Sequence, residues 1–492
     1  MSARDTPLPG YSHFDATRDA RMGQRVKLPE VLGALSHALD LTQGQPRGHA
    51  LRCCWIGTQI GTALGLTPEQ MADLYYVLLL KDLGCSSNAA AICALYQTDD
   101  IAFKHDFKLA DGNLGAILRF VLSKTGVGLG VADRMRATLK VIRKSDRIAQ
   151  NLIQTRCQKG ADIAERLRFS AAVQDGIRCL DEHWDGSGRP QGLAGHAVPL
   201  AANIALLAQV VDVFHQANGR SAAATAVRSR GNSWFDPSLV DVFLACAAQD
   251  SFWSGVEDPQ IETVVFAAAP ARADPPMDDT YLDDIAYAFA DVIDAKSPFT
   301  ADHSRRVMLY ADMIAGELGF SADHRTWLRR VALLHDVGKL AVSNTILDKP
   351  GRPSPAEWDV IRSHPTLSAE ILTRVSVFAD MAPVAAAHHE RLDGKGYPNG
   401  LNAKTLSIEA MVLTAADVFD ALSADRPYRS ALPVGEALQI MRAGAGTIHH
   451  PTCLDALERG LARLGQSDEL DLQHGHIPAE NAPRHPGTSM SG

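Results

Sequence analysis

Seven histidine and aspartate residues in the second half of the chain are candidate ligands for divalent metal ions. Imidazole combined with carboxylate suits Fe, Mn, Zn or Ni, and suits Ca poorly. Seven ligands are too many for one ion, but a carboxylate such as Asp336 can bridge two ions and leave open positions for water and substrate. The candidate ligands are His303, His335, Asp336, His364, His388, His389 and Asp417.

Such a site has a definite chemistry. Two ions roughly 3.5–4 Å apart lower the pKa of a bridging water, so that hydroxide is available near neutral pH. Cationic groups then neutralise the charge that develops when a phosphodiester is attacked. Lys339 lies one turn after His335 on the same predicted helix, so its ammonium can reach the same pocket. Arg426 and Arg429, in "DRPYR", are spaced so that both guanidinium groups could face one anionic ligand.

Each of these residues alone has an ordinary explanation. A single histidine is usually a surface or helix-capping residue, and two nearby arginines usually form a solvated face. Lys339 alone would be expected to extend its ammonium into solvent. The joint occurrence of the whole set favours the metal site over these alternatives.

Helical periodicity dominates the segments that must position these residues. In "HSRRVMLYADMIAGELGF" the apolar residues repeat at three- and four-residue intervals, and "RTWLRRVALLHDVGKL" follows the same pattern. Alternating strand patterns are scarce. The sequence therefore predicts an all-α fold.

The composition is that of a soluble globular protein of several domains. The chain has 492 residues and a net charge of −9, which gives no reason to expect binding to DNA or to an anionic membrane. Its eight cysteines include no CxxC and fit reduced thiols. The sequence shows no signal peptide, and no run approaches the ~20 apolar residues that span a bilayer. We expect a cytoplasmic protein.

Four similar segments occur in the same order in both halves of the chain. "HWDGSGRPQGL" (183–193) resembles "RLDGKGYPNGL" (391–401), and each is followed by Asp-Val-Phe, at 212–214 and 417–419. Upstream, "GHALR" and "LLLKDLGC" correspond to "DHSRR" and "ALLHDVGK". The sequence thus predicts two copies of one helical domain, at 28–265 and 281–464. A loose N-terminus (1–27), a linker (266–280) and a disordered tail (465–492) complete the expected organisation.

The first copy has lost most of the candidate ligands. It keeps His49, Asp82 and Asp212, but Lys81 stands where His335 does, and Leu180-Asp181 replaces the tandem histidines. About 46 additional residues between Cys85 and Asp181 leave no assignable counterpart of His364. A cation at a ligand position repels a metal ion, so we expect no metal site here. This copy could pack against the second, bind a regulatory ligand, or form a homodimer.

The motif order in the second copy, from "HDVGK" through "HHERLDGKGYP" to "DRPYR", resembles the HD-GYP subgroup of the HD-domain metal-dependent phosphohydrolases. The resemblance implies hydrolysis of cyclic di-GMP to pGpG or GMP by two divalent metal ions, with Fe or Mn favoured. It assigns the seven candidate ligands to the metals and identifies Asp336 and Lys339 as catalytic. It further implies nucleotide contacts for Lys339, Arg426 and Arg429, and a signature loop at Gly396, Tyr397 and Pro398 that could contact other signalling domains.

Two departures from the family pattern refine these expectations. Phe299 occupies the position where some members have a glutamate that holds a third metal, which favours two ions here. Asp302 replaces the usual glycine before the first histidine. The alternatives are an HD phosphohydrolase for another cyclic dinucleotide or nucleotide, and a non-catalytic receptor or scaffold. The complete ligand set and Lys339 argue against a receptor, because a receptor needs no activated water.

Overall fold

The computed structural model describes residues 12–17, 28–109, 114–126, 130–270, 278–426 and 429–466. Within these ranges the regular elements are helices, accompanied by isolated β-bridges such as the one between Asp393 and Asn402. The prediction of an all-α fold is confirmed. The predicted tail begins inside the last helix, α24, which ends at Gln466, and the rest of the tail lies outside the described residues.

The chain forms two compact units that interleave along the sequence. They do not correspond one to one with the two predicted domains, whose boundaries stay a prediction. Unit 1 consists of residues 1–18, 302–333 and 387–492, and unit 2 of residues 19–301 and 334–386.

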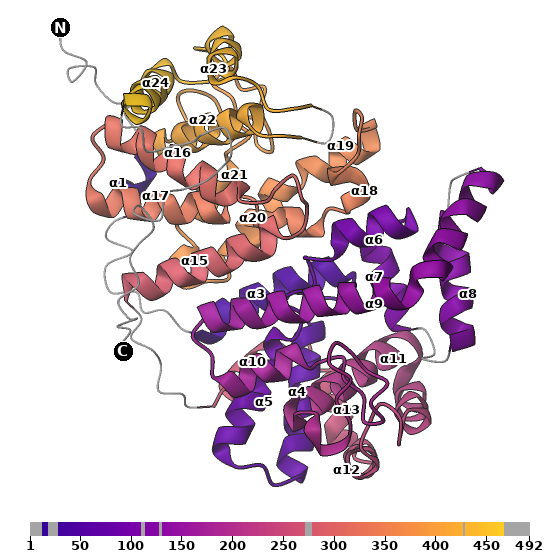
Figure 1. The fold of residues 1–492 in the computed structure, drawn as a ribbon. Coiled ribbons are helices and arrows are strands. Elements are labelled where there is room, and N and C mark those ends of the chain that lie inside the picture. The colour runs from indigo at the N-terminus through magenta and orange to yellow at the C-terminus, as the bar shows by residue number, and fades with distance from the viewer. Residues whose placement is uncertain are drawn as a thin grey trace, which may run out of the picture. The chain divides into compact units, whose positions relative to one another are not determined.

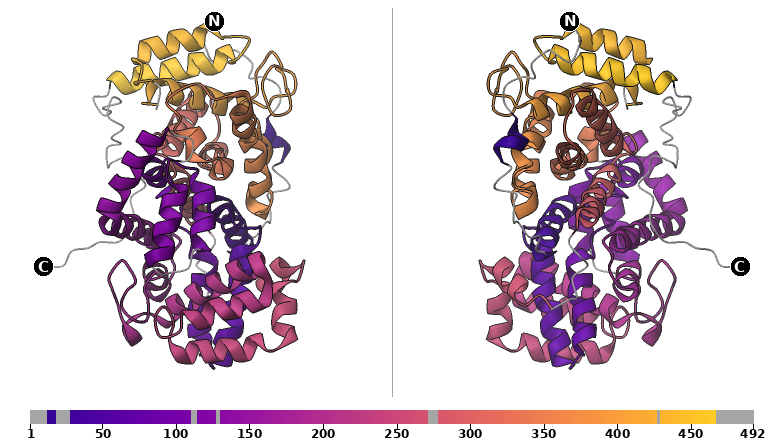
Figure 2. Two further views of the ribbon diagram at one scale, coloured as in Figure 1. Left: turned by 90° about the vertical axis from the view of Figure 1, so that its right-hand side faces the viewer. Right: turned by 90° about the vertical axis from the view of Figure 1, so that its left-hand side faces the viewer.

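In unit 1, α16 packs against α22 and α24, and α23 runs beside α24 (Figures 1 and 2). Ser407 begins α22 with an N-cap, its hydroxyl accepting a hydrogen bond from the backbone N–H of Ala410 at 3.3 Å. The unit contains α1 (His13–Ala16), α16 (His303–Glu317), α17 (Ala322–Leu334), α22 (Ile408–Ser423), α23 (Val434–Ala443) and α24 (Pro451–Gln466).

In unit 2, α4 packs against α5 and α11 (Figure 1). The short helix η3 packs against α20 and α3. The elements that precede the linker are α3 (Leu28–Gln43), α4 (His49–Ala63), α5 (Pro68–Leu80), α6 (Ala89–Tyr96), α7 (Asp100–Lys108), α8 (Leu114–Lys124), α9 (Val131–Arg166), α10 (Ala171–Arg178), η2 (Gly195–Ala197), α11 (Leu200–Ser229), α12 (Pro237–Ala247), α13 (Asp250–Val256) and α14 (Ile261–Ala267). After it come α15 (Asp279–Asp294), η3 (Val337–Ala341), α18 (Asn344–Leu347), α19 (Pro355–Arg362), α20 (His364–Leu372), η4 (Ser376–Phe378) and α21 (Ala382–Ala386).

Residues 12–17, which the sequence assigns to a loose N-terminus, are instead anchored within unit 1. The Glu409 carboxylate accepts hydrogen bonds from the Ser12 hydroxyl at 2.6 Å and from the backbone N–H of His13 at 3.0 Å. The Phe14 ring stacks on His324 with 4.2 Å between centroids. No local pattern indicated this anchor, because the partner, Glu409, lies almost 400 residues away.

Among the described residues, one helix is long and apolar enough to cross a membrane by length and composition. This is α11, and 67% of its most apolar window is buried inside the structure. A buried core helix passes the same test, and α11, which packs against α4 and α5, is buried at 202–213 and again at Ala223, Ala226 and Val227. The apolar character of α11 is therefore explained by its place in the core of unit 2.

Candidate metal centre

Three of the candidate ligands lie in unit 2 around one carboxylate. Asp336 Oδ2 is 3.3 Å from His335 Nε2, and Asp336 Oδ1 is 3.3 Å from His364 Nε2. All three side chains are almost completely buried. His364 Nδ1 lies 2.6 Å from the carbonyl oxygen of Ile361, which can only accept, so Nδ1 carries the proton and Nε2 presents its lone pair to Asp336.

These distances fit metal coordination. Two ligand atoms that each lie about 2.0–2.2 Å from one ion are roughly 3–3.4 Å apart at octahedral or tetrahedral angles. Each oxygen of Asp336 is at such a distance from a different histidine. Each carboxylate oxygen thus has the spacing of a metal ligand with one histidine, and the bridging of two ions by Asp336 stays a prediction.

The helix that leads to this site is shorter than its periodicity predicts. α17 ends at Leu334, and Asp336 begins the short 3-10 helix η3, which contains Lys339. The prediction that His335 and Lys339 share one α-helix is therefore wrong. Lys339 still reaches the site, because its Nζ lies 2.5 Å from Asp336 Oδ2.

Two further candidate ligands lie in unit 1, on α16 and α22. His303 Nδ1 is 2.7 Å from Asp420 Oδ2, and His303 Nε2 is 3.4 Å from Asp417 Oδ1. Asp417 and Asp420 are three residues apart on α22 and so lie on one face of that helix. Asp420 thus fixes the orientation of the imidazole through Nδ1. Asp417 lies on the opposite side of the ring, next to Nε2, the nitrogen that we expect to bind a metal ion.

The carboxylate of Asp420 stays ionised behind the ligand. Burial alone would raise its pKa, but hydrogen bonds and charge interactions with His303 and Arg306 lower the pKa to about 2. Arg306 Nε donates to Asp420 Oδ1 at 2.5 Å. Neither Asp420 nor Arg306 was predicted from the sequence. The Asp-x-x-Asp spacing on α22 could have indicated Asp420.

Asp302 begins α16 in a left-handed conformation, with φ of 56°. Gly48 precedes His49 in the first copy with φ of 83°. Glycine adopts this conformation without strain, and aspartate is among the few other residues that tolerate it. The tight entry into α16 therefore explains why a glycine is usual here and why an aspartate can replace it.

His388 and His389 lie in the turn that follows α21, with ring centroids 4.0 Å apart. The backbone carbonyl of His388 accepts a hydrogen bond from Thr414 Oγ1 at 3.0 Å, which ties this turn to α22. The ring of Tyr397, in the signature loop, lies 4.9 Å from the ring of His389. Within unit 1, the tandem histidines are thus held between the loop and the helix that carries Asp417.

The signature loop is built around Glu390. Its carboxylate accepts hydrogen bonds from the backbone N–H groups of Asn399 and Leu401, at 2.6 and 2.9 Å. A Cβ atom at Gly396 would lie 2.4 Å from the Cα of Glu390, so only glycine fits there. Glu182 makes the same pair of bonds in the first copy, to Gln191 and Leu193, at 2.6 and 2.9 Å. The loop is therefore part of the fold, independent of the metal ligands.

The two arginines of "DRPYR" have different surroundings. The Arg429 guanidinium donates to the carbonyl oxygens of Ala421 and Leu422, at 2.7 and 2.8 Å, and so caps the end of α22. Arg426 Nη2 lies 3.8 Å from Asp420 Oδ2. Arg429 thus has a structural role, and the contact of either arginine with a substrate stays a prediction.

The first copy repeats the histidine–aspartate–arginine arrangement of the second. His49 Nδ1 and Arg52 Nε each lie 2.6 Å from Asp212, as His303 and Arg306 surround Asp420. Asp212 therefore corresponds to Asp420, and the predicted match with Asp417 is wrong by one helical turn. The position of Asp417 belongs to Gln209, three residues before Asp212.

Lys81 takes the place of a ligand in this copy. Its Nζ lies 3.1 Å from His49 Nε2 and 3.4 Å from Gln209 Oε1, and forms an ion pair with Asp82. His49, Cys53 and Asp212 have the spacing of metal ligands, but the ammonium of Lys81 occupies the open side of His49. The absence of a metal ion from this copy stays a prediction.

Arg156, on α9, provides the counterpart of His364 that the sequence could not place. A Cβ at Gly338 would lie 2.0 Å from the carbonyl oxygen of His364, and a Cβ at Gly84 would lie 1.8 Å from that of Arg156. Each glycine therefore packs against the carbonyl oxygen of one residue, and this shared contact identifies Arg156 as the counterpart of His364. No sequence signal could have shown this, because the inserted segment precedes Arg156 and hides the register.

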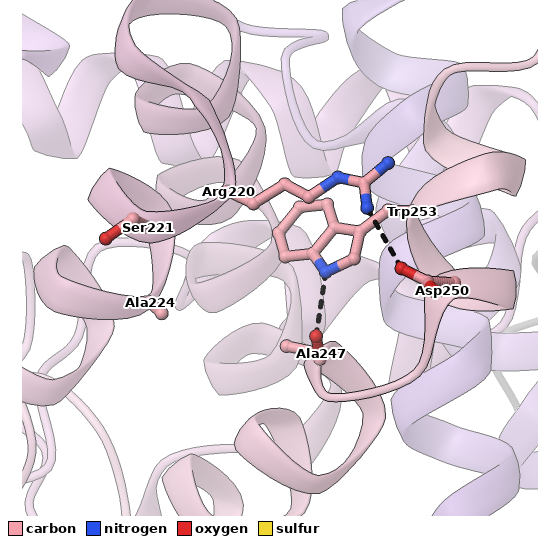
Figure 3. A pocket seen from close by; sticks show the side chains of 6 residues that line it. All are labelled: Arg220, Ser221, Ala224, Ala247, Asp250 and Trp253. Carbon is pink, nitrogen blue, oxygen red and sulfur yellow. Dashed lines mark hydrogen bonds and ion pairs between the residues drawn. The ribbon is translucent and has the colours of Figure 1, made fainter.

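A surface hollow of about 290 Å³ in unit 2 is lined by other residues, namely Arg220, Ser221, Ala224, Ala247, Asp250 and Trp253 (Figure 3). Its Arg220 guanidinium lies 5.8 Å from the Trp253 ring and donates to Asp250 at 3.2 Å, while Trp253 Nε1 donates to the carbonyl oxygen of Ala247 (Figure 3). The lining residues include no histidine or cysteine.

Comparisons with known proteins agree with this geometry. A family model described as HD domain matches residues 137–239 and 288–451. The 3'3'-cGAMP-specific phosphodiesterase 3 of Vibrio cholerae serotype O1 is 48% identical over 437 residues, which cover 89% of this chain and 95% of that protein. The cyclic di-GMP phosphodiesterase response regulator RpfG of Xanthomonas campestris is 37% identical over 179 residues, 36% of this chain and 47% of that protein.

A solved structure gives the same result. The crystal structure of a cyclic GMP-AMP specific phosphodiesterase of V. cholerae matches with a TM-score of 0.60 and 43% identity, and covers 88% of this chain and 97% of that one. The similarity to these V. cholerae proteins extends over most of the chain, whereas the similarity to RpfG covers about a third.

Proposed function

The chain belongs to the HD-GYP phosphodiesterases of the HD-domain family, and we propose that it hydrolyses 3'3'-cGAMP in preference to cyclic di-GMP. One observation supports this choice of substrate. The relatives that match nearly the whole chain, first copy included, are described as specific for cyclic GMP-AMP. Cyclic di-GMP is the second candidate, since the matched segment of RpfG belongs to a cyclic di-GMP phosphodiesterase.

We assign the seven candidate ligands to divalent metal ions, two per chain, with Fe or Mn favoured by the mixture of imidazole and carboxylate. When bound, such ions supply Lewis acidity and an activated water. Three of the assignments are supported by donor atoms 3.3 Å apart around Asp336, and two by the 3.4 Å separation of His303 and Asp417. The spacing of the tandem histidines supports the remaining two.

The chain's own residues then bind and orient the phosphodiester. Lys339 lies against Asp336 and can transfer its hydrogen bond to a phosphoryl oxygen when the carboxylate binds metal. Arg426 can neutralise a second phosphate, while Arg429 fixes the end of α22 from which this segment leaves. Opening one phosphodiester bond yields a linear dinucleotide, and opening both yields mononucleotides.

The test is a competition between the two substrates. The full chain, loaded with Mn(II) or Fe(II), is given equal concentrations of 3'3'-cGAMP and cyclic di-GMP, and linear products are measured by mass spectrometry. We expect kcat/KM to favour 3'3'-cGAMP by tenfold or more. His335→Ala and Asp336→Ala should abolish turnover of both, whereas Asp323→Asn, an exposed change on α17, should not.

Each other result has a definite meaning. A tenfold preference for cyclic di-GMP would support the second candidate. Binding of either substrate without turnover by the metal-loaded wild type would support the alternative that the protein is a non-catalytic receptor. Metal analysis provides an independent check, since about two ions per chain should be lost in the double variant His388→Ala/His389→Ala.

Three further expectations belong to this proposal: a cytoplasmic location, a homodimer, and contact with other signalling domains through Gly396, Tyr397 and Pro398. The loop is suited to such contact because Tyr397 and Pro398 are only partly buried within unit 1. Size-exclusion chromatography with light scattering would test the dimer.

A further inference from the structure

The first copy holds side-chain cations where the second copy holds candidate metal ligands. Lys81 stands in the position of His335, and Arg156 in that of His364. A third cation, Lys108, enters the same site from the end of α7 and lies 3.8 Å from Asp82 Oδ1. Thus three fixed cations gather at the position where the second copy is expected to bind two divalent ions.

Lys108 is the least satisfied of the three. Only 10% of its side chain is exposed, and its Nζ has no hydrogen-bond partner among the residues that the structure describes. A buried ammonium normally donates two or three hydrogen bonds, and leaving it without them costs free energy. The nearest carboxylate, Asp82, already pairs with Lys81. The arrangement therefore leaves donor capacity at Lys108 for an acceptor from outside the chain.

The charges of the site do not cancel. Lys81, Lys108 and Arg156 face Asp82 and Asp181, which leaves one positive charge in excess. Asp40, a neighbouring carboxylate, adds at most a partial negative charge near neutral pH, because burial raises its pKa to about 7. An anion at this site would thus gain both a charge partner and hydrogen-bond donors.

The site is open at one side. The side chains of Arg156 and Asp181 are 16% and 17% exposed, and that of Lys108 is 10% exposed, whereas that of Lys81 is fully buried. A ligand that enters from solvent therefore meets Lys108 and Arg156 first. Arg189, which corresponds to Tyr397 of the signature loop, stands beside α9 with its Nη1 3.3 Å from Gln150 Oε1.

We propose that the first copy is a binding site for a phosphate group, with Lys108 as its principal contact and Arg156 at its rim. The phosphate takes the place that the substrate phosphate has beside the metals of the second copy. It is bound without hydrolysis, because Lys81, Gln209 and Leu180 replace ligands that an activated water would need. The proposal concerns the first copy alone and does not depend on which cyclic dinucleotide the second copy hydrolyses.

The phosphate could be free or carried by a nucleotide, and three probes distinguish these sources. Pyrophosphate, GMP and cyclic di-GMP are titrated calorimetrically into the full chain carrying Asp336→Ala and freed of metal, which removes the metals from the second copy. Equal binding of pyrophosphate and GMP would identify a site for the phosphate alone. Tighter binding of GMP or cyclic di-GMP would identify a nucleotide site.

Two substitutions assign the binding to Lys108. Lys108→Met should lower the affinity for the bound probe tenfold or more, since this change removes a charged hydrogen-bond donor. Lys108→Arg should retain most of the affinity. Lys124→Met, which removes a 38% exposed cation on the neighbouring α8, should change nothing. Equal binding by the Lys108→Met and unchanged chains would overturn the proposal, as would the absence of saturable binding of all three probes.

A second measurement uses the unmodified chain and so does not depend on how a variant folds. Lysines are acetylated briefly with and without pyrophosphate, and the modified positions are read by mass spectrometry. Pyrophosphate should protect Lys108 and leave Lys124 as reactive as before. Unchanged reactivity of Lys108 at a saturating concentration of a bound probe would show that the probe binds elsewhere.

Discussion

Asp420 provides the sharpest test of how the metal ligands are held. It contacts no predicted metal position itself but receives the Nδ1–H of His303 at 2.7 Å and the guanidinium of Arg306 at 2.5 Å. Asp420→Asn keeps the shape of the side chain and removes its charge. We expect this variant to lose metal affinity and activity while His303 itself remains.

The magnitude follows from the hydrogen bonds that the asparagine can keep. Loss of a partner behind a metal-bound histidine typically lowers metal affinity 10- to 100-fold, or about 1.4–2.7 kcal/mol. The single oxygen of asparagine can accept from His303 or from Arg306. The loss of metal affinity should be near tenfold if the asparagine oxygen keeps its bond to His303, and near 100-fold if that oxygen bonds to Arg306 instead.

The first copy supplies a matched control. Asp212 makes the same contacts with His49 and Arg52, both at 2.6 Å, but Lys81 occupies the metal side of that histidine. Asp212→Asn should therefore cost stability without changing metal binding. Breaking a buried charge pair costs about 3–5 kcal/mol. Asp420→Asn should cost less than Asp212→Asn, because the Arg306 side chain is 20% exposed and that of Arg52 only 9%.

The assay is metal content at buffered free Mn(II), with unfolding of both variants followed in denaturant. Equal loss of metal in Asp420→Asn and Asp212→Asn would refute the reasoning, because it would show that the loss follows from destabilisation. Unchanged metal affinity in Asp420→Asn would show that His303 needs no support from this carboxylate.

Three other predictions concern buried charges. Burial opposes ionisation of Glu409, but its hydrogen bonds to His324 and Ser12 lower its pKa from 4.5 to about 2. The ionised carboxylate therefore contributes about 3 kcal/mol to the free energy of unfolding. This contribution is present above pH 4.5 and is lost as the pH falls towards 2. Thermal unfolding between pH 2 and 6 should show this slope in the wild type and a smaller one in Glu409→Gln. Asp100→Asn should cost about 3–5 kcal/mol in denaturant unfolding, since it leaves the buried Lys296 and Lys104 without their carboxylate; the cap variant Asp99→Ala should cost only about 1 kcal/mol. Lys81→Met should destabilise the chain by a similar 3–5 kcal/mol, because Asp82 loses its closest cation, and elemental analysis should find the metal content unchanged.

Local patterns were enough to predict the fold class and the repeat. Helical periodicity is written into each segment, and the Gly-rich loop carries its own constraint, since a side chain at Gly396 or Gly188 would collide with the backbone of Glu390 or Glu182. The spacing from His303 to His335 equals that from His49 to Lys81, so these positions could be aligned without a structure. The proposal that Asp336 bridges two ions likewise came from chemistry alone, and it stays a prediction.

The errors and omissions share a different cause. Helix periodicity does not show where a helix ends, so Lys339 was placed on an α-helix that stops at Leu334. The Asp-Val-Phe match placed Asp212 one turn away from its true counterpart, because the tripeptide repeats in sequence while the contact with histidine is made by the next aspartate of α22. Arg156 and the anchor of residues 12–17 depend on contacts between distant segments, which no local pattern encodes.

The two copies together separate what supports this fold from what supports its chemistry. Both keep the glutamate that holds the loop and the aspartate that joins a histidine to an arginine, so these groups suffice for the framework. Only the second copy adds the imidazoles that face the ligand side. In the first copy the negative charge of Asp82 would be as costly to bury as that of Asp336, and the ammonium of Lys81 neutralises it in place of a metal. Because an ammonium cannot activate water but still attracts phosphate, we expect the change to remove hydrolysis and to keep the affinity for the same chemical group.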